Sequence, residues 1–252
     1  MPLDNPWFYV AAIPAVLVAG VSKGGFGGGL GILAVPLMAM TLSPLEAAAI
    51  MAPLLCAMDI FGLRSYWGTW HRRLTLLMIP GAFAGMAVAA LTFGTIGEAS
   101  LRIFIGGIAL FFALHYWLQR VAPLTRLAMP TWLGPIAGAL SGFTSFIAHA
   151  GGPPVQVFLL AQNLDKTLYV GTTVVFFTVL NYTKLVPYAG LGLFTWPNLA
   201  TALVLAPLAP VGMWLGFKLH GKVSQELFYK LCYGFLVIVG AKLVADGLGV
   251  AI

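Results

Sequence analysis

The sequence predicts an all-α polytopic membrane protein built from two inverted repeats. The 252 residues are 60% hydrophobic and only 8% charged, whereas soluble domains carry about 25% charged residues. The apolar stretches are long and do not alternate with polar residues, which favours membrane helices over a β-barrel. Glycine and proline interrupt one apolar stretch in each half of the chain, at residues 22–31 and 149–154. These paired interruptions are the basis for predicting repeats.

The apolar segments follow one another with short polar loops between them. They lie at Trp7–Val21, Leu30–Leu42, Leu45–Leu63, Leu74–Phe93, Leu101–Leu118, Trp132–Ala148, Val155–Leu160, Leu168–Pro187, Trp196–Leu219 and Leu227–Ala245. A polar linker at Gln119–Thr131 divides the chain, so we expect one repeat at residues 1–122 and another at 123–252. Each repeat would hold a broken segment, either re-entrant or made of half-helices, and three transmembrane helices. Met1–Pro6 has no basic region or cleavage site, so we expect no cleaved signal peptide.

Corresponding residues recur in the two halves. Asp59 aligns with Asn181 at an offset of about 122 residues, and a series of such matches at a nearly constant offset indicates an internal duplication. At similar offsets Gly20 aligns with Gly142, Ser22 with Thr144, Gly28-Gly29 with Gly151-Gly152, Thr69-Trp70 with Thr195-Trp196, Pro80 with Pro207 and Gly85-Met86 with Gly212-Met213. Glycine- and proline-interrupted apolar segments in both halves indicate the binding site of a transporter.

The distribution of positive charge favours inverted over parallel repeats. If each broken segment crosses the membrane once, the repeats are parallel and the loop cations divide six against five. If each is re-entrant or crosses twice, the repeats are inverted and the cations divide nine against two, the two being Arg102 and Lys242. Cytoplasmic loops carry an excess of Lys and Arg. We therefore predict inverted repeats with both termini outside, and attribute the net charge of +6 to topology rather than to nucleic-acid binding.

The first break, Ser22–Gly31, has the composition of a ligand site. Six glycines in the eight residues 24–31 disfavour a regular helix, and Lys23 is an ionisable group where the helix is expected to end. Loosened backbone and a charge inside a bilayer both indicate a cavity. The half-helix after each break presents unpaired N–H groups and the positive end of its dipole. Two such tips facing each other would form an anion site.

The candidate substrate-binding residues are Ser22, Lys23, Gly27, Gly28 and Gly29 at the first break, Thr144, Ser145, His149, Gly151 and Gly152 at the second, and Asn181. Asp59 and His149 are the candidates for coupling transport to a proton or another ion. No set of residues indicates a metal site or a cofactor. Cys56 and Cys232 lie in separate apolar segments, where we expect buried free thiols.

Structural roles stay open for several of these residues. The glycines could serve only close helix packing, and Lys23 could extend towards an interface. His149 could be a hydrogen-bonded core residue. Asp59 could carry a proton or hold a cation such as Lys23 in a structural pair. Lys184 could line the same cavity as Asn181 or lie near the outer interface.

The chain resembles the sulfite exporter TauE/SafE family, also called the 4-toluene sulfonate uptake permease family, over nearly its whole length. The resemblance rests on the duplicated architecture and on two motifs. The first is Lys23-Gly24-Gly25-Phe26-Gly27-Gly28-Gly29, followed by Pro36. The second is Ser141-Gly142-Phe143-Thr144-Ser145-Phe146-Ile147-Ala148-His149-Ala150-Gly151-Gly152-Pro153-Pro154. The second motif departs from the common glycine-rich version and looks like the branch associated with sulfite or sulfonate export.

The resemblance implies secondary transport of a small sulfur-containing anion, sulfite or an organosulfonate, across the bacterial inner membrane. We expect a multi-pass carrier with alternating access and ion or proton coupling, and not an enzyme. Its partners would be the anion and the lipid bilayer, with a homodimer left open. An anion channel without alternating access is one alternative. An intramembrane hydrolase that uses Ser145 and His149, four residues apart on one helix face, is another.

Overall fold

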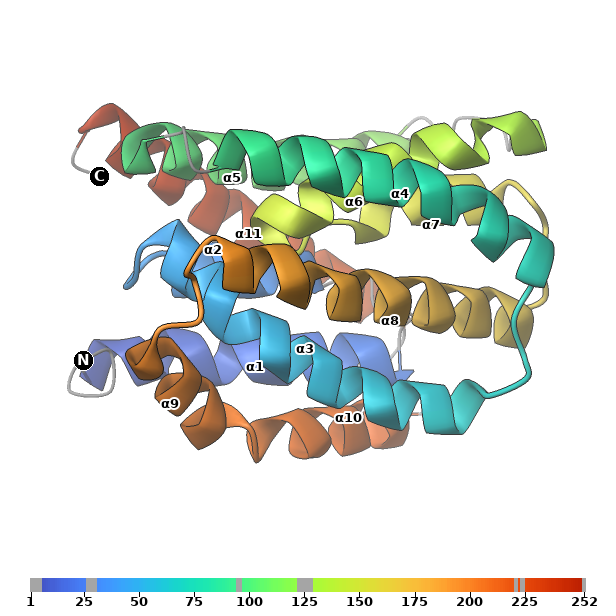
Figure 1. Cartoon of the computed structure of the whole chain (residues 1–252), viewed down its shortest axis with the longest axis horizontal. Coiled ribbons are helices and arrows are strands. Elements are labelled where there is room, and N and C mark those ends of the chain that lie inside the picture. Colours follow the sequence, from blue (N-terminus) through green and yellow to red (C-terminus); the bar gives the residue numbers. More distant parts are fainter. Residues whose placement is uncertain are drawn as a thin grey trace.

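Helices account for nearly all of the described chain, which comprises residues 6–25, 31–93, 97–121, 129–219, 222 and 225–250 of a computed structural model (Figure 1). The helices of the first half are α1 (Pro6–Gly25), α2 (Ala34–Met38), α3 (Pro44–Tyr66), α4 (Arg72–Phe93) and α5 (Glu98–Val121). Those of the second half are α6 (Gly134–Ala148), α7 (Gly152–Leu160), α8 (Lys166–Gly190), α9 (Trp196–Leu205), α10 (Leu208–Leu219) and α11 (Gln225–Leu248). Short 3-10 turns, Gly31–Leu33 and Thr131–Leu133, precede α2 and α6. No strand occurs in the described ranges.

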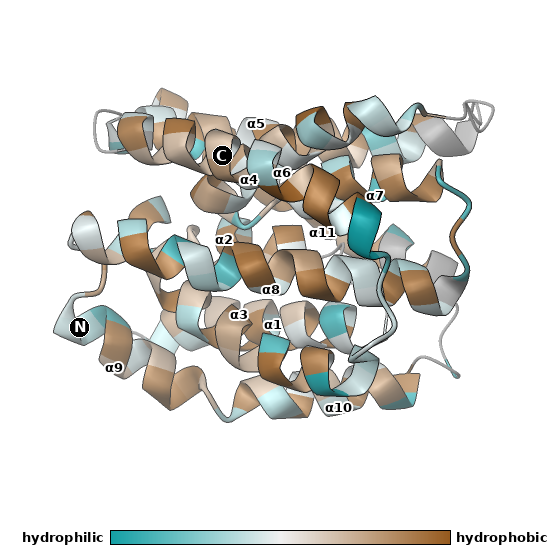
Figure 2. Cartoon of the chain, turned by 45° about the vertical axis from the view of Figure 1, so that its right-hand side comes forward, coloured by the Kyte–Doolittle hydropathy of each residue, from teal (hydrophilic) through white to brown (hydrophobic). Residues whose placement is uncertain are grey.

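Six of the described helical stretches are long and apolar enough to cross a membrane. They are Pro6–Gly25, Pro44–Tyr66, Arg72–Thr92, Glu98–Leu118, Trp196–Leu219 and Lys230–Leu248. Large apolar side chains such as Leu91 and Leu203 are exposed, and Figure 2 shows that hydrophobic residues predominate along many of the helices. Exposed apolar surface of this kind is typical of a face that contacts lipid. The predicted all-α polytopic class is confirmed.

Equivalent helices of the two halves begin at equivalent capping residues. Ser43 caps α3, where its hydroxyl accepts from the Glu46 N–H at 3.2 Å and the Glu46 carboxylate accepts from the Ser43 N–H at 3.1 Å. Asp165 caps α8 by accepting from the Leu168 N–H at 3.0 Å. Such caps satisfy backbone donors that a helix leaves unpaired at its start. Positions 43 and 165 are separated by 122 residues, the same separation as Asp59 and Asn181.

Equivalent helices also run in opposite directions. Along α3 and α8, Asp59 bonds Asn181, and past the end of α3 the His71 N–H donates to Thr172 at 2.9 Å. Residue numbers therefore rise on one helix as they fall on the other. Helices α5 and α11 are antiparallel in the same way, because Gly106 contacts Gly240 whereas Gly247 contacts the earlier Ile103. These directions support an inverted repeat. The orientation in a bilayer stays a prediction, as does the boundary at residues 122–123, because residue 122 is outside the described ranges.

Each broken helix packs against a helix from the other half of the chain. A Cβ on Gly85 of α4 would lie 2.0 Å from the Ala139 carbonyl oxygen of α6. A Cβ on Gly212 of α10 would lie 3.2 Å from the Leu17 carbonyl oxygen of α1. Gly85 and Gly212 are equivalent by the predicted alignment, and so are positions 17 and 139. We call these two contacts, α1 with α10 and α4 with α6, the glycine seams.

The first break starts later in the chain than the sequence predicts. Ser22, Lys23, Gly24 and Gly25 form the last turn of α1, so the expectation that the helix ends at Lys23 is wrong. A Cβ on Gly24 would lie 2.4 Å from the Met213 carbonyl oxygen, and one on Gly25 would lie 2.3 Å from the Gly216 carbonyl oxygen. This contact with α10 overrides the low helix propensity of glycine. Residues 26–30, which include the predicted site residues Gly27, Gly28 and Gly29, lie outside the described residues, and Gly31 begins a 3-10 turn.

The second break forms a helical hairpin of α6 and α7. Helix α6 ends at Ala148, as predicted, and Gly151 is the N-cap of α7, with proline in its first turn. Just after α7, the Gln162 side chain donates to the Met129 carbonyl oxygen at 2.9 Å. The chain therefore returns after α7 to the level at which α6 begins. Proline also divides the single predicted segment Trp196–Leu219 into α9 and α10, with a turn at Ala206-Pro207.

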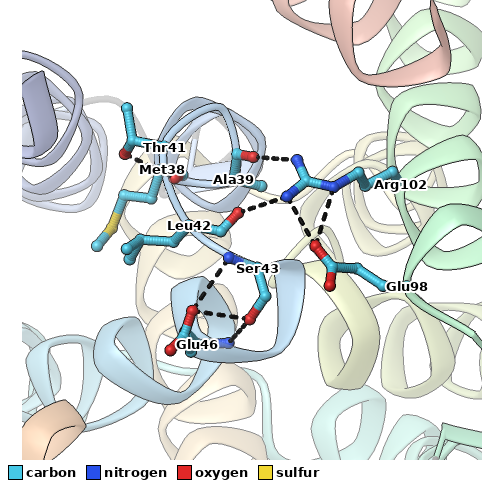
Figure 3. A network of polar contacts seen from close by, with 8 residues as sticks. All are labelled: Met38, Ala39, Thr41, Leu42, Ser43, Glu46, Glu98 and Arg102. Carbon is cyan, nitrogen blue, oxygen red and sulfur yellow. Dashed lines mark hydrogen bonds and ion pairs between the residues drawn. The ribbon is translucent and has the colours of Figure 1, made fainter. Parts of the chain in front are cut away.

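Arg102 joins the start of α5 to the end of α2 (Figure 3). Its guanidinium donates to the carbonyl oxygens of Ala39 and Leu42 at 2.6 and 3.0 Å, and it pairs with Glu98 at 2.8 Å. A cation at a helix C-terminus satisfies carbonyls and favours the dipole. Lys242, the other cation assigned to the outer side, pairs with Asp246 at 2.5 Å. Both exceptions to the predicted charge bias are therefore ion-paired.

Candidate functional site

Lys23, Asp59 and Asn181 form a polar cluster where α1, α3 and α8 meet. The Lys23 ammonium forms an ion pair with Asp59 Oδ1 and donates to the Leu55 carbonyl oxygen at 3.3 Å. Asn181 Nδ2 donates to Asp59 Oδ2 at 2.6 Å. Only 2% of the Asp59 side chain is exposed, against 15% of Lys23. Asp59 could hold a cation such as Lys23 in a structural pair, and the structure shows this ion pair.

A small cavity adjoins this cluster. It has a volume of about 20 Å³ and is lined by Lys23, Met58, Asp59, Gly62, Thr173, Val174, Phe177 and Met213. A space of this size holds about one water molecule. A larger ligand could enter only after a rearrangement of the residues that line the cavity, which come from α1, α3, α8 and α10.

The backbone at the second break is held in a left-handed turn at His149, which has φ 51°. The His149 N–H donates to the Ser145 carbonyl oxygen at 3.1 Å, and the Ala150 N–H donates to the Thr144 carbonyl oxygen at 3.2 Å, which closes the end of α6. Left-handed conformation is uncommon for a residue other than glycine, and such residues often occur at functional sites. The side-chain contacts of His149 keep it there.

Lys184 of α8 reaches the same turn. Its ammonium donates to the carbonyl oxygen of Ser145 at 3.2 Å, to the Ser145 hydroxyl at 3.1 Å and to His149 Nδ1 at 2.7 Å. Because an ammonium only donates, Nδ1 carries no proton, and Nε2 donates to the Ala48 carbonyl oxygen at 3.0 Å. With Lys184 as the donor to Nδ1, His149 is the neutral Nε2–H tautomer. The His149 side chain is buried and hydrogen-bonded, which agrees with the alternative that it is a core residue.

Lys184 is not among the substrate-binding residues that the sequence predicts, although one local pattern points to it. It lies one helical turn after Asn181, so both face the same side of α8. Its exposed fraction is 0%, which rules out a place at the outer interface. Since Asn181 contacts the first cluster and Lys184 the second, one face of α8 connects the two breaks.

The start of α7 presents unpaired donors, as predicted. No described residue accepts a hydrogen bond from the N–H groups of Gly151 and Gly152, although the Gly151 carbonyl oxygen accepts from Ser141 at 2.7 Å. One turn further along, the side-chain nitrogen of Gln156 is buried and has no partner among the described residues. Gln156 was missed from the sequence because a lone glutamine in an apolar segment carries no pattern.

The predicted hydroxyl donors are less available than expected. Thr144 donates to the carbonyl oxygens of Leu140 and Ala150 at 2.8 and 3.1 Å, so its hydroxyl is engaged in the turn. Ser22 is buried with 0% exposure. Ser145 and His149 each contact Lys184, and none of the described hydrogen bonds joins the Ser145 hydroxyl to the His149 ring. The geometry therefore does not form the Ser–His pair of a hydrolase.

Comparison with known proteins identifies the family. The family model described as sulfite exporter TauE/SafE matches residues 12–243, which is most of the chain. Comparisons with curated proteins and with solved structures found no significant match. The matched region includes both breaks, the Lys23 cluster and the Lys184 cluster. The chain therefore belongs to the sulfite exporter TauE/SafE family, a family of membrane transporters.

Proposed function

We propose that this protein is a secondary transporter that moves sulfite or an organosulfonate across the bacterial inner membrane. The anion binds between the two breaks, with Lys23 on one side and the second-break turn on the other. Its oxygens would accept hydrogen bonds from the N–H groups of Gly151 and Gly152 and from those of residues 27–29. The Ser22, Thr144 and Ser145 hydroxyls and the Asn181 amide would complete the site.

The observation that carries this proposal is the convergence of two cations on one face of α8. Lys23 pairs with Asp59, which also accepts a hydrogen bond from Asn181 of α8, and Lys184 of α8 holds the turn of the second break. Charged groups within a membrane protein are costly and mark substrate pathways. In a member of a sulfite exporter family, two such cations beside unpaired backbone donors are suited to an oxyanion.

Alternating access is supported by the small cavity and by the opposite directions of equivalent helices. A cavity of about 20 Å³ beside Lys23 is closed to a sulfonate, so a carrier would have to open it. Inverted repeats provide two related halves that can rock against each other about a central site. A channel would instead need a continuous pore in one state.

His149 is the stronger of the two candidates for proton coupling. Asp59 is engaged through both carboxylate oxygens, by Lys23 and Asn181. His149 Nδ1 has a lone pair that Lys184 occupies. A proton can bind Nδ1 only when the Lys184 ammonium leaves it, so the two events exclude each other. Movement of Lys184 towards an anion would therefore favour protonation of His149 and link the two fluxes.

The test is sulfite flux into proteoliposomes that contain the purified protein. We expect saturable flux and counterflow for the unchanged protein, and strong loss of both in Lys23→Ala and Gly28→Leu. Lys222→Ala is the matched control because Lys222 is exposed. Unchanged flux in both site variants would refute the assignment. Flux without saturation or counterflow would favour the channel.

A further inference from the structure

We propose that Lys184 is a substrate-binding residue whose buried positive charge is neutralised by the transported anion, and that the site consequently takes a monoanion. This inference rests on the proposed function, since it specifies the charge of the same substrate. It assigns a role to Lys184, which the sequence alone left either in the cavity of Asn181 or near the outer interface. The contacts of Lys184, the charge balance around it and the internal repeat each support it.

The contacts of Lys184 solvate its ammonium without neutralising it. All three acceptors are uncharged groups, namely the Ser145 carbonyl oxygen, the Ser145 hydroxyl and His149 Nδ1. Within the described residues no carboxylate forms an ion pair with Lys184, whose exposed fraction is 0%. A charge buried in this way is strongly disfavoured unless a counter-ion accompanies it. The missing counter-ion would be supplied from outside the chain.

The charges at the two breaks leave an excess of one. Lys23 and Asp59 cancel, because they form an ion pair, and Asp59 is further occupied by Asn181. His149 is neutral, so Lys184 contributes the remaining positive charge. A bound monoanion, such as an organosulfonate or hydrogen sulfite, brings the sum to zero. While His149 stays neutral, a dianion would leave a buried negative charge, and it would be balanced only if His149 bound a proton in the same step.

The repeat explains why the second lysine comes from a different helix. At the separation of 122 residues, Lys23 corresponds to Ser145, and Gly62 corresponds to Lys184. The first repeat has its lysine at the position of Ser145, on the broken helix. The second repeat has its lysine at the position of Gly62, on the helix that follows. Lys184 Nζ reaches the hydroxyl of Ser145, the counterpart of Lys23. On the other side Gly62 lines the cavity beside Lys23, where a side chain would fill the space. Each repeat thus contributes one buried or half-buried ammonium beside its own break.

The experiment compares Lys184→Met with the unchanged protein in detergent, using ethanesulfonate as the monoanion and sulfate as the dianion. Melting temperature and calorimetric affinity are measured with and without each anion. We expect the unchanged protein to prefer ethanesulfonate, and Lys184→Met to lose at least about tenfold in affinity for it. The melting temperature of the anion-free variant should be equal or higher, because an unneutralised charge has been removed. Lys222→Met, at an exposed position, should match the unchanged protein.

Other results would overturn the inference. If Lys184→Met binds ethanesulfonate normally but melts at a lower temperature without anion, Lys184 serves only to close the turn. If sulfate binds more tightly than ethanesulfonate to the unchanged protein, the monoanion assignment is wrong. Should Lys184→Met fail to fold, Lys184→Gln keeps a donor without charge, and failure of both variants to fold would establish a structural role. If the unchanged protein binds no sulfur anion and transports none, the proposed function itself fails.

Discussion

Asn181 donates a hydrogen bond to its own counterpart in the other repeat, Asp59, with Nδ2 and Oδ2 separated by 2.6 Å. Equivalent residues can touch in this way only close to the axis that relates the two repeats. The axis therefore passes between α3 and α8, beside the Lys23 ion pair. The candidate site lies where the two halves of the chain meet.

Replacing Asp59 tests the energetic role of this pair. Asp59→Asn removes the counter-ion of Lys23 and should lower the free energy of unfolding by about 3 kcal/mol, because one buried charge is left unpaired. The double variant Lys23→Met with Asp59→Asn should recover most of that loss. Denaturant unfolding of the single and double variants provides the measurement. Equal destabilisation of both would mean that the ion pair itself is unimportant.

Two adjacent glycines of α5 provide a matched test of helix packing. A Cβ on Gly106 would lie 2.6 Å from the Gly240 carbonyl oxygen of α11, whereas nothing lies within 4 Å of one on Gly107. Gly106→Ala should therefore lower the free energy of unfolding by about 1–3 kcal/mol. Gly107→Ala should raise it by up to about 1 kcal/mol, since alanine favours a helix. Thermal unfolding of the two variants decides, and similar effects at both positions would contradict the packing of α5 on α11.

Replacing Gln156 should stabilise the protein and weaken the binding of the anion. Gln156→Met removes a buried amide that has no partner in the described chain, so the free energy of unfolding should rise by about 1 kcal/mol. The stabilisation that a sulfonate produces should fall in the same variant, if the amide points at the anion. Gln162→Met is the control, because that amide donates to the Met129 carbonyl oxygen and its loss should destabilise. A rise in stability with unchanged binding would remove Gln156 from the site.

Arg102 should be needed to hold the end of α2. Arg102→Met leaves the carbonyl oxygens of Ala39 and Leu42 without their charged donor, which should lower the free energy of unfolding by about 1–3 kcal/mol. Glu98→Gln removes only the exposed partner of the pair and should change it by less than about 1 kcal/mol. Comparison of the two unfolding curves separates helix capping from surface charge. Equal effects would assign the stability to the ion pair.

The sequence predicts the positions of the helices better than the contacts of their polar groups. The end of α6 at Ala148 and the start of α7 follow from apolar runs that glycine and proline interrupt, which are local signals. The persistence of α1 to Gly25 could not be predicted, because it depends on contact with Gly216 of α10, far away in the chain. The burial of Lys184 has the same origin. Lys184 is buried because α8 lies between the two breaks, and no local pattern in the sequence encodes that position.

The glycine seams have a consequence for how such a chain arises and for how it can be divided. Each seam joins the broken helix of one half to a helix of the other, with backbones in direct contact, so the main packing partner of each broken helix lies in the other half. The molecule has the connectivity of two exchanged protomers that a linker has fused. If the two halves arose by duplication, a half-length chain would have needed an antiparallel second copy to form the same seams. By the same reasoning, the two halves made as separate polypeptides should be stable only when they are produced together in one membrane.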